Sequence, residues 1–117
     1  MRTSQEKLNP SFKNQIIKTL AQTLADLKDL DEVETFLSDF FTESEYEAFS
    51  KRLAISYWLK KGRSYANIKQ NLKVSSATVA AVPGMMDSRG FKLALKKIEA
   101  EEWANVWSEK IKKFVGK

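Results

Sequence analysis

Residues 74–86 read VSSATVAAVPGMM. Near its start this stretch has a pair of serines, and the small and β-branched side chains that follow continue up to a proline. Serine is a favoured helix cap, and small side chains let a backbone come close to the floor of a DNA groove. There, methyl groups contact thymine methyls and hydroxyls bond to base edges. The run predicts a helix that reads DNA or an ordinary packed helix. The candidate base-facing residues are Ser75, Ser76, Ala77, Thr78, Ala80 and Ala81.

Basic side chains flank this run in the sequence, and an anionic partner would suit them. Residues 1–50 carry five basic and ten acidic side chains, a net of −5, whereas residues 51–117 carry fifteen and five, a net of +10. Such a division favours nucleic acid as a partner, although a well-solvated surface has the same composition. The candidate phosphate contacts are Lys60, Lys61, Arg63, Lys69 and Lys73.

Other chemistry is poorly represented in the 117 residues, which contain neither cysteine nor histidine. Disulfides and thiolate metal sites are therefore excluded, and the usual general base is missing. We expect that the protein is not an enzyme, that it has no catalytic or metal site, and that it uses no cofactor. No apolar run approaches the roughly 20 residues that span a bilayer, and the N-terminus lacks a signal-peptide layout. The sequence predicts a cytoplasmic protein with no membrane partner.

We expect the basic and small residues to lie on helices, because apolar residues recur at intervals of three to four along most of the chain. We predict a single all-α domain, 1–117, with about six helices. The first spans about 10–28 after Asn9, and Asp31 with Glu34 caps the second. Thr42 with Glu45 caps a third helix, which buries Tyr46, Phe49, Leu53 and Tyr57 and stops at Gly62.

A helix-turn-helix is predicted over residues 64–82, with an ordinary helical hairpin as the alternative. Ser64 caps a helix to about Leu72, and Ser75 or Ser76 caps the next, whose Val79 packs back on it. The turn lacks the usual glycine, so Lys73 or a neighbour takes the left-handed geometry. Pro83 then ends the second helix and Gly84 turns the chain. From a cap at Asp87 or Ser88, residues 91–114 form one long helix or two abutting ones.

Several motifs fall in register with those of the Trp repressor family. They are the stretch TESEYEAFSKRLAI from Thr42, the helix stop at Gly62 and the Ala77-Thr78-Val79 core of the second motif helix. Over about residues 33–82 the chain resembles this family, and is most similar to its uncharacterised bacterial members. The resemblance implies an intertwined homodimer in which residues 10–41 dimerise, residues 42–82 form the core, and residues 87–117 add C-terminal helices. Two recognition helices would then enter major grooves about 34 Å apart on double-stranded DNA.

The resemblance is incomplete at the effector pocket. Thr42 and Arg52 match the threonine and the first of two arginines that hold tryptophan in the responsive member. Ala81 stands where the second arginine would be, so one face of the indole sandwich is missing and tryptophan control is not expected. Thr42 and Arg52 are the candidate effector pocket. The alternative for Arg52 is an ion pair with Glu45 or another acidic neighbour.

These observations favour a sequence-specific DNA-binding transcriptional regulator of the repressor type, acting as a homodimer. One alternative is a helical interaction or assembly protein that has lost DNA binding, since residues 74–86 carry no arginine or lysine. Another is the DNA-binding subunit of a transposase. The Trp103, Val106 and Trp107 stripe is expected to belong to the core or to a dimer seam.

Overall fold

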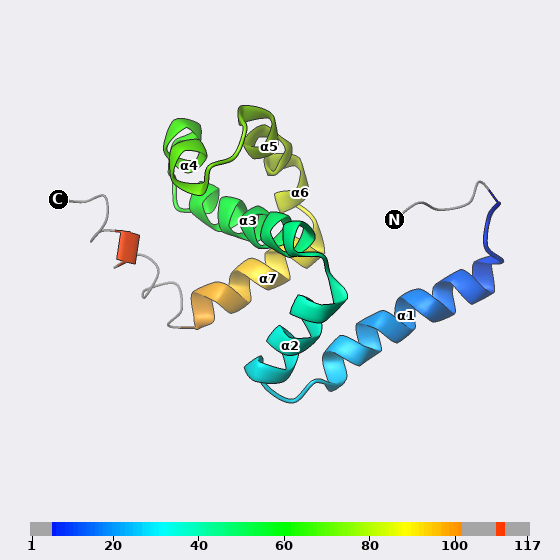
Figure 1. The fold of residues 1–117 in the computed structure, drawn as a ribbon. Coiled ribbons are helices and arrows are strands. Elements are labelled where there is room, and N and C mark those ends of the chain that lie inside the picture. Colours follow the sequence, from blue (N-terminus) through cyan, green and yellow to red (C-terminus); the bar gives the residue numbers. More distant parts are fainter. Residues whose placement is uncertain (1–5, 102–109, 112–117) are drawn as a thin grey trace. The chain divides into compact units, whose positions relative to one another are not determined.

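The computed structural model describes residues 6–101 and 110–111, and its elements are shown in Figure 1. The all-α class is confirmed, since the elements of this part of the chain are all helices. There are seven of them, against the six or so predicted, because a short helix follows the helix-turn-helix. They are α1 (Pro10–Asp26), α2 (Leu30–Phe40), α3 (Glu43–Lys60), α4 (Tyr65–Leu72), α5 (Ser76–Ala81), α6 (Pro83–Met86) and α7 (Arg89–Ala100).

The chain divides into two compact units, Met1–Tyr46 and Glu47–Lys117, with the division inside α3. In the first unit α1 begins at Pro10, and the Asn9 side chain accepts hydrogen bonds from the backbone N–H groups of Ser11 and Phe12, at 2.9 and 3.3 Å. Neither α1 nor α2 contains a buried residue. The apolar stripe of α1 is therefore not buried within its own unit.

The N-terminus of α2 differs from the prediction. The Asp29 carboxylate accepts from the Glu32 N–H at 2.9 Å, and the Glu32 carboxylate accepts from the Lys28 N–H at 2.8 Å. The predicted pair, Asp31 with Glu34, is wrong by two residues. Both motifs have the same spacing, but α2 already begins at Leu30, so only Asp29 precedes the first turn and can reach its free N–H groups.

The predicted capping box at the start of α3 is confirmed. Thr42 Oγ1 accepts from the Glu45 N–H at 3.1 Å, while Glu45 accepts from the Thr42 N–H at 2.8 Å. The hydrogen bond that the Thr42 N–H donates to the carboxylate lowers the pKa of Glu45. At its other end α3 stops before Gly62, whose φ of 85° is the left-handed value that glycine adopts at least cost.

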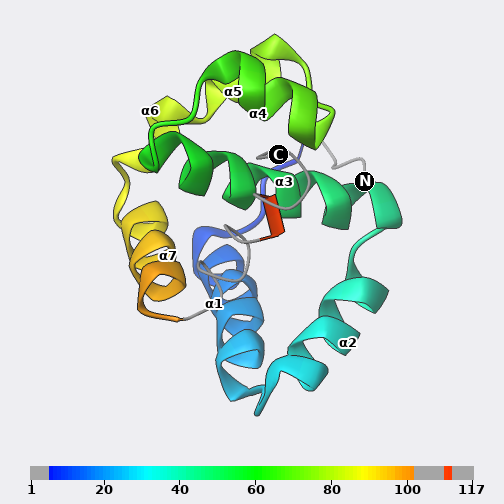
Figure 2. The same ribbon diagram turned by 90° about the vertical axis from the view of Figure 1, so that its left-hand side faces the viewer.

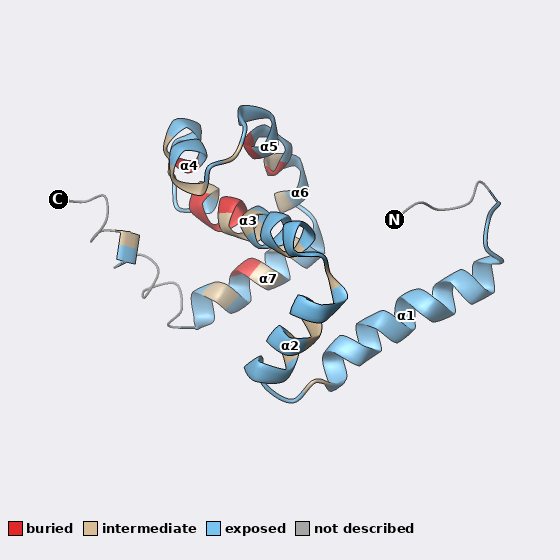
Figure 3. Cartoon of the chain, in the orientation of Figure 1, coloured by how far each residue is buried: buried red, intermediate tan, exposed pale blue. Residues whose placement is uncertain are grey.

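The core of the second unit forms where α3, α4, α5 and α7 meet, and Figure 3 shows buried residues on all four helices. Four consecutive residues of α3, Ile55 to Trp58, are buried, which means that neighbours cover this segment on more than one side. The prediction placed the buried side of α3 too early, since Phe49 is 40% exposed. Figures 1 and 2 show α4 and α5 on one side of α3 and α7 on the other.

The chain after α5 does not turn at Gly84 as predicted. Pro83 instead starts the four-residue α6, where a missing N–H costs nothing, and Gly84 lies inside that helix. Ser88 caps α7 by accepting from the Phe91 N–H at 3.5 Å. Residues 91–114 do not form the single long helix that was one of the two predicted forms, because α7 ends at Ala100 and Glu101 has extended backbone angles. Residues 103–107, with their predicted aromatic stripe, lie outside the described residues. None of the helices in the described ranges is long and apolar enough to cross a membrane.

Candidate nucleic-acid interface

Helices α4 and α5 form the two arms of a compact helix pair. Ser64 Oγ accepts from the Asn67 N–H at 3.1 Å and so caps α4. Ile68 of α4 and Val79 of α5 are fully buried and belong to one cluster, which fixes the two helices against each other. Between them Lys73 has φ 56° and ψ 53°, the left-handed conformation predicted for it. This turn places α5 as the second helix of a helix-turn-helix.

The capping residue of α5 is Ser75, not Ser76. Its Oγ accepts from the Thr78 N–H at 3.1 Å and lies 2.9 Å from the Thr78 hydroxyl. All six residues predicted to face bases are exposed: Ser75, Ser76, Ala77, Thr78, Ala80 and Ala81. The exposed surface of α5 thus consists of methyl and hydroxyl groups with no side chain longer than threonine.

Of the five predicted phosphate contacts, Lys60 is engaged elsewhere. Its ammonium lies 2.5 Å from a carboxylate oxygen of Glu99 on α7, on the side of α3 away from α5. Lys60 lowers the pKa of Glu99 through this hydrogen bond and through its charge. Sequence reasoning missed this pair, because the two residues are 39 positions apart. Lys60 therefore loses support as a phosphate contact.

Two other predicted contacts lie over buried aromatic rings. The Lys61 ammonium is 5.5 Å from the ring centroid of Tyr57, and the Arg63 guanidinium is 5.1 Å from that of Trp58. Arg63 Nη1 also donates to Asn67 Oδ1 at 3.0 Å. Arg63 is thereby held close to the start of α4, where the first helix of such a motif crosses the DNA backbone. The Lys61 contact is to a ring of α3.

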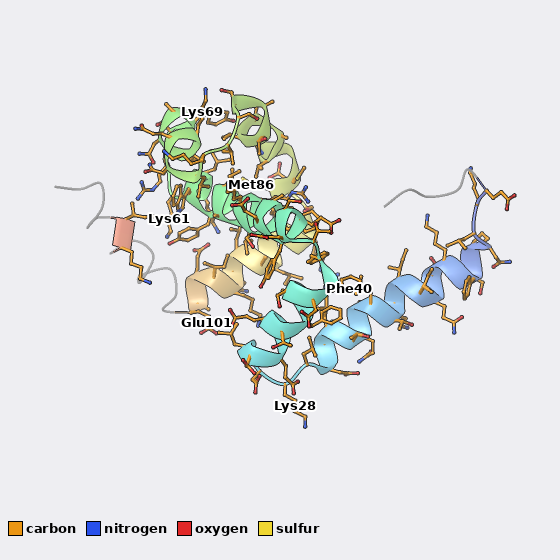
Figure 4. All side chains as sticks on the ribbon, viewed as in Figure 1. Lys28, Phe40, Lys61, Lys69, Met86 and Glu101 are labelled. Carbon is orange, nitrogen blue, oxygen red and sulfur yellow. The ribbon has the colours of Figure 1, made fainter. Side chains whose placement is uncertain are left out.

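The remaining two predicted contacts, Lys69 and Lys73, are exposed on α4 and on the turn after it. Lys61 and Lys69 are labelled in Figure 4. Across the described part of the chain, ion pairs are formed by Lys51 with Glu47 and by Lys60 with Glu99. Lys61, Arg63, Lys69 and Lys73 accordingly form no ion pair with carboxylates of the described residues, although the charge of Lys61 joins Lys60 in lowering the pKa of Glu99.

The two candidate effector residues, Thr42 and Arg52, belong to different units. Thr42 is used in the capping box of α3. The Arg52 guanidinium lies 5.3 Å from the ring centroid of Phe49 and forms no ion pair with described residues, so the predicted pairing with Glu45 is wrong. Glu45 is instead bonded to Thr42.

Arg52 also lines a cavity of about 370 Å³ between α3 and the start of α7. The other lining residues are Phe49, Leu53, Ser88, Gly90, Phe91 and Ala94. Acidic side chains of residues 6–101 and 110–111 form no cluster of three that could hold a metal ion.

Comparison with known proteins agrees with this geometry. The family model described as Trp repressor protein matches residues 15–99, which include α2 to α6 and most of α1 and α7. The chain belongs to the Trp repressor family. Membership indicates a DNA-binding regulator of the helix-turn-helix type.

A relative of the chain is known from Bacillus subtilis, the uncharacterized protein YerC. It is 27% identical over 85 residues, which are 71% of this chain and 82% of YerC. No solved structure matches this Trp repressor family member. The family match ends at residue 99, so residues 100–117 extend beyond the shared part.

Proposed function

We propose that this protein is a sequence-specific transcriptional regulator that binds double-stranded DNA as a homodimer, with α5 in the major groove. The observation that carries the proposal is the helix-turn-helix, whose second helix is packed through Val79 and exposes the rest of its surface. Family membership supports the same function. A helix packed on one side and bare on the other is the arrangement that groove insertion needs.

Base readout by α5 depends on close approach. Its alanine and threonine methyl groups suit thymine methyls, and a hydroxyl bonds to either donors or acceptors. Bidentate recognition of guanine or adenine requires arginine, lysine, asparagine or glutamine, none of which occurs in residues 74–82. We therefore expect α5 to select thymine-containing steps and groove shape, with weaker discrimination than a helix with long polar side chains.

Phosphate binding falls to four side chains of each subunit: Lys61, Arg63, Lys69 and Lys73. They lie before, along and after α4, and none of them forms an ion pair with a described carboxylate. If both subunits of a dimer used all four, the logarithm of affinity would fall with the logarithm of salt concentration at a slope of up to about −7.

A homodimer is supported by the apolar surface of the first unit. Residues of α1 that should form a core are 39–57% exposed, namely Phe12, Ile16, Ile17, Leu20 and Leu24. Beside them in sequence, α2 and the preceding loop line a groove of about 600 Å³ that includes Leu27, Phe36 and Phe40. Exposed apolar surface of this extent marks a protein interface. We propose that a second copy covers it and brings a second α5 into register with the next groove.

Selection of bound duplexes from random DNA tests the whole proposal. Enrichment of a palindromic site with half-sites about one helical turn apart supports it, since a twofold dimer reads two such half-sites. Absence of any retarded complex at low salt contradicts it and favours the interaction protein. That alternative draws on the shortness of α5, which has only six residues.

A further inference from the structure

Arg63 differs from the other cations of the interface because two contacts fix its guanidinium. One face lies over Trp58, which is only 4% exposed, and Nη1 donates to Asn67 Oδ1 at 3.0 Å. Since arginine only donates, it is the Asn67 side-chain oxygen, not the nitrogen, that must point at it. The ring restricts the plane of the guanidinium and the hydrogen bond restricts its rotation within that plane.

Asn67 is itself held firmly by helix α4. Its N–H donates to the Ser64 cap, and its carbonyl accepts from Asn71 Nδ2 at 2.8 Å. The backbone of Asn67 is consequently fixed in α4, and the bond to its side chain fixes the Arg63 guanidinium relative to this helix. The capped start of α4 and the Arg63 side chain thus move as one piece.

Most N–H donors of the Arg63 guanidinium are not used by its bond to Asn67. A guanidinium has five N–H donors, and the bond to Asn67 accounts for one. Arg63 forms no ion pair with the described carboxylates and is half-buried. Two parallel N–H groups of a guanidinium match the two oxygens of a phosphate, and a guanidinium that is already oriented loses little side-chain entropy when it binds.

Resting on the DNA-binding function proposed above, we propose that Asn67 and Trp58 are positioning residues that hold Arg63 ready for a bidentate contact with one DNA phosphate. Lys69 and Lys73 then act as mobile point charges, whereas Arg63 sets the register of α4 on the backbone. Neither Asn67 nor Trp58 needs to contact DNA for this role.

Fluorescence anisotropy with a labelled duplex of fixed, arbitrary sequence tests the proposal, because binding to a phosphate does not depend on base sequence. Arg63→Ala should weaken binding and reduce the magnitude of the salt slope by about 0.9 for each phosphate that is no longer neutralised. Asn67→Ala keeps every charge, so it should leave the slope unchanged while lowering affinity about 2-fold to 10-fold, because Arg63 is then no longer oriented before it binds. The Asn67→Ala change should have no further effect when Arg63 is already alanine.

Asn71→Ala is the matched control, because it removes an asparagine of the same helix whose bond goes to the Asn67 carbonyl and not to Arg63. Because the Ser64 cap still holds Asn67 and the bond from Arg63 to Asn67 remains, its affinity should fall much less than that of Asn67→Ala. Arg63→Lys should behave like Asn67→Ala, with an unchanged slope and lower affinity, because lysine has no planar fork. Circular dichroism of each variant verifies that the helices are intact.

The outcomes separate this inference from the function on which it rests. A wild-type protein that does not bind the duplex at low salt contradicts the proposed function and the inference together. Binding by the wild type with unchanged affinity in Asn67→Ala overturns the inference alone. An additive effect of Asn67→Ala in the Arg63→Ala background also overturns it, since Asn67 would then act independently of Arg63.

Discussion

Helix α1 and the pair α4 and α5 contain apolar residues at the same helical spacing, yet they use them differently. In the second unit Ile68 and Val79 are fully buried, and each helix is held by a core of its own chain. In the first unit Leu20 and Ile17 are 41% and 57% exposed, although α1 is the longer helix. The second unit is therefore stabilised within one chain, whereas the first has apolar surface suited to a partner.

The largest expected effect lies in the core of the second unit. Ile68→Ala should lower its free energy of unfolding by about 2–5 kcal/mol, because it removes three carbons from a fully buried site and leaves a cavity. Hydrogen exchange of the α4 amides measures this decrease. Ile17→Ala, the same deletion on α1, should change the exchange of those amides by less than about 0.5 kcal/mol. Equal decreases in both variants would remove the distinction between the units.

A charge on the apolar face of α1 should act on assembly instead. Leu20→Lys places an ammonium in the proposed dimer interface, so we expect the dimer dissociation constant to rise at least about tenfold, as measured by sedimentation equilibrium. Gln22→Lys is the control, because Gln22 bonds to Asp26 on the polar side of the helix. A wild-type protein that sediments as a monomer, or two variants that behave alike, would contradict the dimer.

A substitution in the turn of the helix-turn-helix should raise the stability of the fold and weaken DNA binding. Lys73→Gly relieves a left-handed lysine, so the free energy of unfolding should rise by up to about 1 kcal/mol. The same change removes a charge that neutralises a phosphate, and the salt slope of DNA binding should fall in magnitude by about 0.9 for each subunit that binds. Lys69→Ala should reduce the slope with little gain in stability. A Lys73→Gly protein with unchanged DNA binding would exclude Lys73 from the interface.

The smallest effect concerns the link between α3 and α7. Lys60 lowers the pKa of Glu99, so this pair stabilises the fold above the pKa of an unfolded glutamate and ceases to do so as pH falls through the lower, folded value. Glu99→Gln should lower the melting temperature slightly at neutral pH and not at strongly acidic pH. Glu101→Gln, which removes a nearby carboxylate without a described ion pair, should not show this difference. A wild-type advantage that persists in acid would argue against the pair.

Local features of the fold could be predicted because their causes lie within a few residues. The capping box of Thr42 with Glu45, the stop at Gly62, the cap at Ser64 and the left-handed Lys73 all depend on short hydrogen bonds or on backbone angles. The cap of α2 was misplaced because two acidic pairs have the same spacing. Only the start of the helix decides which of them meets free N–H groups.

The side of each helix that is buried and the partner of each charge could not be predicted in the same way. Phe49 was expected in the core, but its side chain is 40% exposed. Lys60 was expected to contact a DNA phosphate, but it forms an ion pair with Glu99. Both errors concern contacts between segments far apart in the chain. Periodicity shows that a helix has an apolar side, but not what covers it.

Residue types and spacing alone established that the protein is helical, that its helix-turn-helix lies between Ser64 and Val82, and that it resembles the Trp repressor family. The first two properties follow from caps, breakers and periodicity, which act locally, and the third from sequence motifs that match those of the family. Folding added that Trp58 and Asn67 contact Arg63 and that Lys60 pairs with Glu99 of α7. These arrangements needed the tertiary structure, because the direction of a long cationic side chain depends on the rings, amides and carboxylates that folding brings within its reach.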